Sequence, residues 1–103
     1  MVNAYEELLS ELEYCKKNKD SIKCAFINCK KRKIILKVDF TFEEYEQFLK
    51  ELDFDYDAGY GSQELFGHIW FKDNSWLERY EYDGSECWQY KKYPEISDEC
   101  LRE

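Results

Sequence analysis

An aromatic-rich stretch at residues 65–93 constrains the fold of this chain more than any other part of its sequence. It reads LFGHIWFKDNSWLERYEYDGSECWQYKKY and contains all three Trp of the protein. Two short polar interruptions divide it, Asp73-Asn74 and Asp83-Gly84. Asp-Gly between alternating segments is typical of a hairpin, because a type I′ turn needs positive φ at both central residues. The sequence therefore predicts a three-stranded antiparallel meander over residues 64–93.

Two-residue loops at both interruptions would fix the pairing of these strands. In that register Trp70 faces Leu77 in the first hairpin, and Arg79 faces Trp88 in the second. The more apolar face of the meander, which we expect the helices to cover, then holds Leu65, Ile69, Phe71, Trp76, Tyr80, Tyr82 and Cys87, with Glu78 as its only acid. The other face mixes aromatic and charged side chains: Phe66, His68, Trp70, Leu77, Arg79, Glu81, Glu86, Trp88 and Tyr90.

The residues before the meander predict two helices and a hairpin. Asn3 and Glu6 resemble a capping box, and apolar residues then recur at helical spacing, so we expect a helix over 4–18. A second capping box, Thr41 with Glu44, predicts a helix over 42–52.

Between the two predicted helices, residues 21–40 alternate like two strands that are joined by a short loop at 28–32. On the first of these strands, the residues expected to share one face are Ile22, Cys24 and Phe26. On the second strand, the expected set is Ile34, Leu36, Val38 and Phe40.

These elements predict one α+β domain over residues 1–103. The expected order is α-β-β-α-β-β-β, with an antiparallel sheet and both helices packed on one face. A further short strand is a candidate at residues 54–56. The composition, 44% hydrophobic and 18% aromatic residues with a single Pro, suits a packed core and not a disordered chain.

Composition also restricts the function. A formal net charge of −8 argues against direct nucleic-acid binding, because a phosphate-binding surface needs Lys and Arg. We expect no membrane span and a cytoplasmic location, since no apolar run approaches about 18 residues and no secretion signal opens the chain. The five Cys form no CxxC pair, which predicts reduced thiols without a metal or cofactor.

Charge is distributed unevenly along the chain. Residues 21–38 contain six basic side chains and no acid, whereas residues 39–57 contain eight acids and one Lys. The simplest interpretation of the basic part is an edge hairpin that Lys protects against strand pairing. The acidic part predicts a surface that fits a basic groove of a partner protein, formed by Glu43, Glu44, Glu46, Asp53, Asp55 and Asp57.

Three interpretations of the mixed face of the meander remain open. A twisted sheet can bury part of it, with Arg79 stacked on Trp88. Alternatively it is a partner-binding surface, in which the anchors are Trp70, Arg79, Trp88 and Tyr90. The third interpretation is a small-ligand or catalytic pocket, formed by His68, Arg79, Glu81 and Glu86. No nucleophile, metal triad or phosphate-binding loop accompanies that pocket in the sequence.

Residues 54–96 resemble a signature of small proteins from tailed phages and prophages. The signature runs G-x-G-S-Q-E-L-F-G-x-I-W, then W-x-x-R-x-E-Y-D-G-S-E-W-W and a closing P-x-I. The residues that this sequence keeps are Gly59, Gly61 to Trp70, Trp76, Arg79, Glu81 to Glu86, Trp88, Pro94 and Ile96. It departs at Cys87, where the signature has Trp. The resemblance implies a mobile-element protein, and small acidic phage proteins without enzymatic motifs often block host defence.

The leading hypothesis is therefore a non-enzymatic, anti-CRISPR-like inhibitor in the cytoplasm of a bacterial host. It would bind a host protein, such as a CRISPR effector or another nucleic-acid enzyme, by competing for the groove that holds nucleic acid. One alternative is a small-ligand-binding protein or enzyme that uses the pocket around His68. Another is a homodimer or larger homo-oligomer whose aromatic faces pack together.

Overall fold

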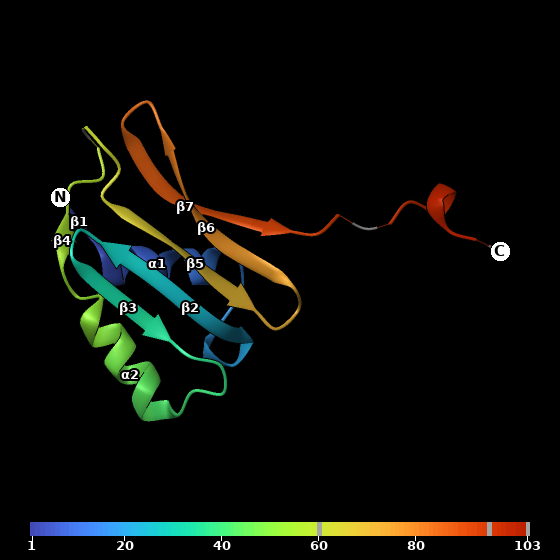
Figure 1. The fold of residues 1–103 in the computed structure, drawn as a ribbon, viewed down its shortest axis with the longest axis horizontal. Helices are drawn as coiled ribbons and strands as arrows, with labels where there is room; N and C mark the ends of the chain where they lie inside the picture. Colours follow the sequence, from blue (N-terminus) through green and yellow to red (C-terminus); the bar gives the residue numbers. More distant parts are fainter. Residues whose placement is uncertain (60, 95, 103) are drawn as a thin grey trace.

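Five antiparallel strands form the main sheet of the protein, in the order β3-β2-β5-β6-β7. They are β2 (Ile22–Cys29), β3 (Arg32–Leu36), β5 (Leu65–Phe71), β6 (Ser75–Tyr82) and β7 (Ser85–Lys92). The computed structural model, drawn in Figure 1, describes residues 1–59, 61–94 and 96–102. Tyr60 and Glu95, which belong to the phage-like segment 54–96, lie outside the described residues.

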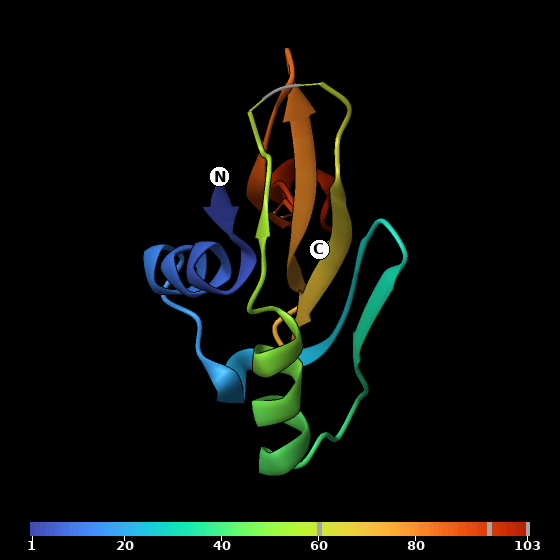
Figure 2. The same cartoon turned by 90° about the vertical axis from the view of Figure 1, so that its left-hand side faces the viewer.

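Two helices, α1 (Ala4–Tyr14) and α2 (Phe42–Glu51), pack on the same face of this sheet (Figure 2). The core lies between the two layers. Its largest fully buried side chains are Leu8, Ile22, Ile27, Leu36, Phe48, Leu52, Leu65, Ile69, Phe71 and Leu77. The predicted α+β fold and its order of elements are confirmed.

Helix α1 ends four residues earlier than predicted. Lys16 adopts a left-handed conformation, with φ of 60°. The backbone N–H of Lys17 donates to the carbonyl of Leu12, and that of Lys16 to Glu13, which together make a Schellman motif. The cluster of Lys after residue 15 therefore caps the helix instead of extending it, and a short 3₁₀ turn, η1 (Lys19–Ser21), leads into β2.

Helix α2 begins as the sequence predicts. The Thr41 side chain accepts a hydrogen bond from the N–H of Glu44 at 3.1 Å, and the Glu44 carboxylate accepts one from the N–H of Thr41 at 3.0 Å. The rings of Phe40 and Tyr45 stack with centroids 5.8 Å apart, which fixes the entry of the chain into the helix.

Two short strands, β1 (Val2–Asn3) and β4 (Asp55–Tyr56), join the start of the chain to the segment after α2. The candidate strand at residues 54–56 is thus present, but it pairs outside the main sheet. At the other end, the chain after β7 runs away from the body of the protein through a 3₁₀ turn, η2 (Asp98–Cys100), as Figure 1 shows.

The predicted faces of β2 and β3 are only partly correct. A bulge between Ile22 and Cys24 reverses the alternation of β2. The buried residues of this strand are consequently Ile22, Ala25, Ile27 and Cys29, while Cys24 and Phe26 lie on the opposite face. On β3, Ile34 and Leu36 are buried as expected, but the strand ends there and Val38 is exposed.

The two hairpins of the meander differ in loop length. In the second hairpin the pairing of Arg79 with Trp88 is confirmed, and the two turn residues, Asp83 and Gly84, have φ of 51° and 86°. In the first hairpin Trp70 pairs with Trp76 instead of Leu77, so the predicted register was wrong by one residue. Its loop has three residues and ends with Asn74, a left-handed residue with φ of 69°.

This one-residue shift exchanges the faces of β6 and β7 relative to β5. The face under the helices contains Leu65, Ile69, Phe71, Ser75, Leu77, Arg79, Glu86 and Trp88. The other face, which neither helix covers, contains Phe66, His68, Trp70, Trp76, Glu78, Tyr80 and Cys87.

Gly67 lets β5 approach β2 closely at the centre of the sheet. Its φ is 151°, and a Cβ at this position would lie 2.4 Å from the carbonyl oxygen of Phe26. Because that atom belongs to the backbone of the neighbouring strand, a larger residue here would push β2 and β5 apart.

Candidate functional site

The uncovered face of the sheet, which we call the open face, presents a belt of aromatic side chains. Phe26 of β2 pairs with His68 of β5, and His68 pairs with Glu78 of β6. The next row of the sheet pairs Cys24, Trp70 and Trp76 in the same way. Large apolar side chains are well exposed there, namely Phe26 (38%), Ile35 (50%), Phe66 (48%), Trp70 (39%) and Tyr80 (40%). A continuous apolar surface of this kind is typical of a contact site.

Neighbouring side chains hold several of these rings in place. The ring of His68 stacks on that of Trp70, with centroids 5.3 Å apart and planes 16° from parallel. Trp76 donates a hydrogen bond from its Nε1 to Glu78 at 2.8 Å and meets the Tyr93 ring edge-on at 5.4 Å. The rings of His68, Trp70 and Trp76 on the open face are therefore held in place by contacts with one another or with Glu78 and Tyr93.

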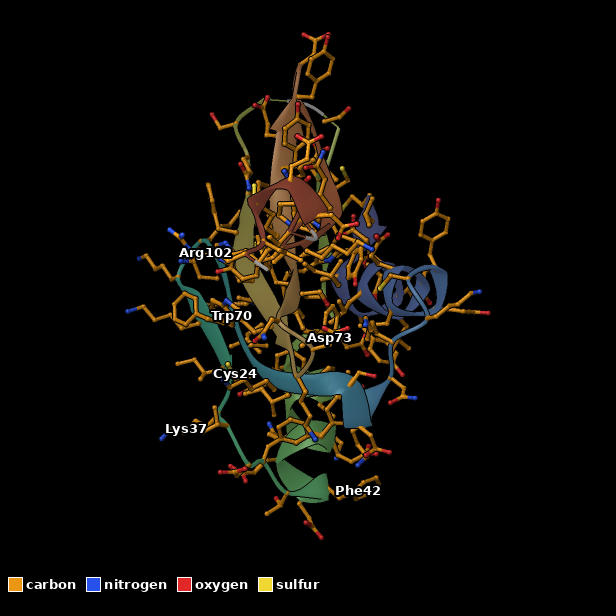
Figure 3. The ribbon with its side chains drawn as sticks, turned by 90° about the vertical axis from the view of Figure 1, so that its right-hand side faces the viewer. Cys24, Lys37, Phe42, Trp70, Asp73 and Arg102 are labelled. Atoms are coloured by element: carbon orange, nitrogen blue, oxygen red, sulfur yellow. The ribbon has the colours of Figure 1, made fainter. Side chains whose placement is uncertain are left out.

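An open hollow of about 640 Å³ lies over these rings. Its lining includes Lys23, Cys24, His68, Trp70, Trp76, Glu78 and Tyr93. Figure 3 shows Cys24, Trp70 and Lys37 projecting on the side of the sheet away from α1.

The charge of the open face is opposite to that of the whole chain. Strand pairing places Lys33 beside Asn28 and Lys91 beside Trp76, both on this face, and Lys37 follows β3 on the same side. Together with Lys23 they surround the aromatic belt, where Glu78 is the acid among the paired residues. The face is thus basic on a protein whose net charge is −8.

A buried ionic cluster lies on the opposite side of the sheet, around Arg79. The Arg79 guanidinium donates from Nη1 to Glu7 at 3.1 Å, and from Nη2 to Glu86 at 2.9 Å and to the Tyr56 hydroxyl at 2.7 Å. The Tyr56 hydroxyl in turn donates to Glu7. The guanidinium lies 4.9 Å from the centroid of the Trp88 ring, so the predicted stacking of Arg79 on Trp88 is present.

The surroundings of this cluster shift its proton affinities. Burial and the hydrogen bond to Glu7 raise the pKa of the Tyr56 hydroxyl strongly. Burial alone would lower the pKa of Arg79, but the carboxylates of Glu7 and Glu86 outweigh it and raise that pKa. Arg79 therefore stays charged inside the protein, and Tyr56 stays neutral.

Glu86 ties the cluster to the backbone. One carboxylate oxygen accepts a hydrogen bond from the N–H of Leu65 at 3.0 Å, and the other from Glu64 at 2.8 Å. The cluster thus joins α1, β4, β5, β6 and β7, and its geometry is that of a structural ion-pair network with every carboxylate satisfied.

The predicted acidic surface, which we call the acidic rim, lies on the helix side of the molecule. Its exposed members are Glu43, Glu44, Glu46, Asp53 and Asp55, and Asp57 is half-buried. Three of them also support the fold. Glu44 closes the capping box of α2, and Asp53 and Asp55 accept hydrogen bonds from the Asn3 amide at 3.0 and 3.2 Å.

The structure separates the residues that the sequence analysis grouped as partner anchors. Trp70 is on the open face, whereas Arg79 (8% exposed) and Trp88 (6% exposed) are buried on the helix side, where Arg79 contacts α1 and β4. Tyr90 is half-buried and its ring lies 6.2 Å from that of Phe71. Arg79 and Trp88 therefore stabilise the fold from inside, and a partner cannot reach them in this conformation.

The proposed small-ligand pocket is likewise divided. His68 is on the open face, Arg79 and Glu86 are in the buried cluster, and Glu81 is exposed near the Asp83-Gly84 turn, where it accepts the N–H of Gly84. These four side chains do not converge on one cavity.

The five Cys are free thiols, and burial raises the pKa of Cys29 and of Cys15.

Sequence reasoning missed part of each site. It did not connect Glu7 or Tyr56 with Arg79, because these residues are 72 and 23 positions away along the chain. It also placed Trp76 and Tyr80 on the face expected under the helices, and Phe26 on the same face of its strand as Ile22, which is buried. Side chains alternate between the two faces along a strand, and this alternation did put Phe66, His68 and Trp70 together on the correct face of β5.

Comparison of the chain with protein-family models, curated proteins and solved structures gives no match. Within residues 1–59, 61–94 and 96–102, no cluster of three or more His, Cys, Asp or Glu has the arrangement needed to hold a metal ion. None of the helices in that part of the chain is long and apolar enough to cross a membrane. Geometry and charge therefore carry the functional argument.

Proposed function

We propose that this protein is a non-enzymatic inhibitor, encoded by a phage or prophage, that binds a host defence protein in the bacterial cytoplasm. The acidic rim would occupy a basic groove of that protein and compete with nucleic acid for it, as in an anti-CRISPR protein acting on a CRISPR effector. The observation that carries the proposal is the exposure of the rim acids, three of which are on α2, the helix that packs on the other side of the sheet from the Lys-rich open face.

Electrostatics supports this mode of action. Complementary charge speeds the encounter of two surfaces and orients them before contact. A basic groove that binds a polyanion is built to accept closely spaced negative charges. The exposed carboxylates of α2 and of residues 53–55 supply such a group on a folded scaffold.

The four residues of the predicted pocket do not lie together, and this separation supports a binding role over a catalytic one. General acid–base chemistry needs its groups within about 3 Å of the same reacting atoms. His68 and Arg79 lie on opposite faces of the sheet. The resemblance of residues 54–96 to phage proteins supports the host-directed role.

The test uses a variant of the rim that leaves the fold intact. It combines two rim acids with Glu51, an exposed acid at the end of the same helix: Glu43→Lys, Glu46→Lys and Glu51→Lys leave the capping residue Glu44 and the Asn3 contacts untouched. The matched control has the same change in net charge elsewhere: Glu13→Lys, Asp98→Lys and Glu99→Lys, all exposed.

Each protein is immobilised and incubated with nuclease-treated lysate of a bacterial host, and captured proteins are identified by mass spectrometry. We expect the natural protein and the control to capture a nucleic-acid enzyme that added single-stranded or double-stranded DNA or RNA displaces. We expect the rim variant to lose it. Retention of the same protein by the rim variant, or capture that nucleic acid does not displace, would refute the proposal.

A further inference from the structure

We propose that the open face is a binding site for single-stranded nucleic acid, whose bases stack on the aromatic belt while the surrounding lysines contact its phosphates. This inference concerns a different surface from the acidic rim and does not depend on the proposed function. It rests on three observations: which rings are exposed, where the local charge lies, and how far away the acids are.

The first observation is the set of accessible rings. Phe26, Phe66, Trp70 and Tyr80 each expose between 38% and 48% of their surface, and strand pairing puts them on the face opposite to that on which α1 and α2 pack. They come from three adjacent strands, β2, β5 and β6, so they form a surface and not a single contact. On β5, His68 lies between Phe66 and Trp70, so successive rings along this strand are about 6.6 Å apart, a spacing that an extended strand of nucleotides can follow. Every base has a flat π-face, so such a platform binds single strands without needing a particular sequence.

The second observation is the composition of charge around the rings. Lys23, Lys33, Lys37 and Lys91 border the belt. Glu78, the acid within it, is already bonded to Trp76. A negatively charged ligand with planar rings fits this combination of groups.

The third observation is the position of the rim acids, which explains how a protein with negative net charge can bind an anionic ligand. The protein has a formal net charge of −8, from which we expected no direct contact with nucleic acid. Glu43, Glu44 and Glu46 of the rim are on α2, which packs on the other side of the sheet. Since the screening length is about 10 Å at 0.1 M salt, the open face then acts largely through its own lysines.

Other occupants fit less well. Duplex DNA hides its base faces inside the stack, so the exposed rings would have no partner. A second copy of this chain, packed face to face, would bring the same group of lysines against itself. Single-stranded nucleic acid satisfies both the rings and the lysines.

The experiment measures fluorescence anisotropy of fluorescein-labelled 12-nucleotide oligo-dT and oligo-U with the full chain. We expect a Kd on the order of 10⁻⁵ M near 0.1 M salt, the range of sequence-independent binding. With four lysines on phosphates, log K should fall with log salt at a slope of roughly −3, since each contact contributes about −0.7 for single strands.

Matched variants separate stacking from charge. Trp70→Ala should weaken binding roughly 5- to 100-fold, because it removes one stacking surface. Its control, Tyr14→Ala, removes an exposed ring from α1 and should leave Kd unchanged. Lys37→Glu should weaken binding and make the salt slope shallower by about 1, whereas Lys50→Glu, the same charge change on α2, should not. Near-ultraviolet circular dichroism checks that each variant is folded.

Several results would overturn the inference. One is the absence of binding at 0.1 M salt. Equal affinity for an abasic oligonucleotide of the same length would remove the stacking argument, and an equal affinity for poly-glutamate would make the site a general anion surface. Light scattering that shows a dimer disrupted by Trp70→Ala would assign the open face to self-association instead. None of these outcomes affects the rim, which the lysate experiment tests separately.

Discussion

Arg79 shows how one residue can hold several elements of this fold together. Its guanidinium meets Glu7 from α1, Tyr56 from β4 and Glu86 from β7. A charged group inside a protein is tolerated only when its partners are close and well oriented. The sheet and α1 therefore depend on this side chain for their relative position.

Replacing Arg79 by Met should lower the free energy of unfolding by about 3–5 kcal/mol, because Glu86 would remain buried without its cation. Urea unfolding at pH 7 measures the loss. Arg32→Met is the matched control, since Arg32 is an exposed Arg whose guanidinium lies 4.4 Å from the Phe54 ring. It should cost less than about 1 kcal/mol. Equal losses in the two variants would show that the buried cluster does not stabilise the fold.

Tyr56 gives the same cluster a dependence on pH. Its pKa is higher in the folded protein than the usual value of 10.0, because of burial and the hydrogen bond to Glu7. Its contribution to stability is therefore fully present below pH 10 and declines as the pH rises above it, where the unfolded chain loses this proton and the folded protein keeps it. Tyr56→Phe should flatten the fall in unfolding free energy between pH 9.5 and 11.

Tyr14→Phe is the control for that measurement, because Tyr14 is 83% exposed. We expect it to keep the pH dependence of the natural protein. If Tyr56→Phe and Tyr14→Phe showed the same slope in urea unfolding across this range, the Tyr56 hydroxyl would not be held in its neutral form by the cluster.

At the scale of elements, the loop between β5 and β6 decides which side chains are exposed. The N–H of Asn74 donates to the carbonyl of Phe71 at 3.3 Å, and Asn74 has φ of 69°. The Asp73 carboxylate accepts hydrogen bonds from the N–H and the hydroxyl of Ser75. The loop is a three-residue turn with one left-handed residue, and it sets the register of β6.

Asn74→Gly should keep the unfolding temperature or raise it slightly, because Gly adopts positive φ without strain. Asn74→Val should cost about 1–2 kcal/mol, since a β-branched residue resists that conformation. Lys72→Val, in the same loop, serves as the control and should change stability by less than about 0.5 kcal/mol. A Val variant as stable as the Gly variant in calorimetry would contradict the left-handed conformation of Asn74.

The same loop marks where prediction from sequence stops. Asp83-Gly84 suits a two-residue turn with positive φ at both positions, so the second hairpin could be predicted. Asp73-Asn74 suits either a two-residue or a three-residue loop, because Asn tolerates a left-handed conformation on its own. The choice depends on the contacts of Ser75, and it moved every residue of β6 and β7 to the other face.

The order of helices and strands was predictable for local reasons, since caps, periodic apolar residues and turn residues are read within a few positions. Stacking of Arg79 on Trp88 was one of the interpretations left open, but the hydrogen bonds of Arg79 to Glu7 and Tyr56 could not be predicted, because these residues lie far away along the chain. The acidic rim was identified from local charge alone. The residues of the open face could be identified only with the correct pairing of β5 with β6, so the sequence assigned only the β5 residues of that face correctly.

At the scale of the whole molecule, charge and aromatic residues are segregated between two surfaces. The helix layer carries the acidic rim, and the sheet presents rings and lysines on its other side. The two proposed contacts, with a basic protein groove and with a single nucleic-acid strand, therefore use different surfaces. The nucleic-acid proposal depends on which face of the sheet is uncovered, whereas the rim proposal depends on the acids of α2 and of residues 53–57.

Solvent access of the Trp side chains shows which face of the sheet is uncovered. Trp70→Phe with Trp76→Phe leaves only Trp88, which is 6% exposed, and Trp76→Phe with Trp88→Phe leaves only Trp70, which is 39% exposed. In acrylamide quenching we predict that Trp70 is quenched several-fold more strongly than Trp88 and emits at longer wavelength. Equal quenching of Trp70 and Trp88 would place them on the same face of the sheet and would contradict the register in which Trp70 is on the open face and Trp88 lies under the helices.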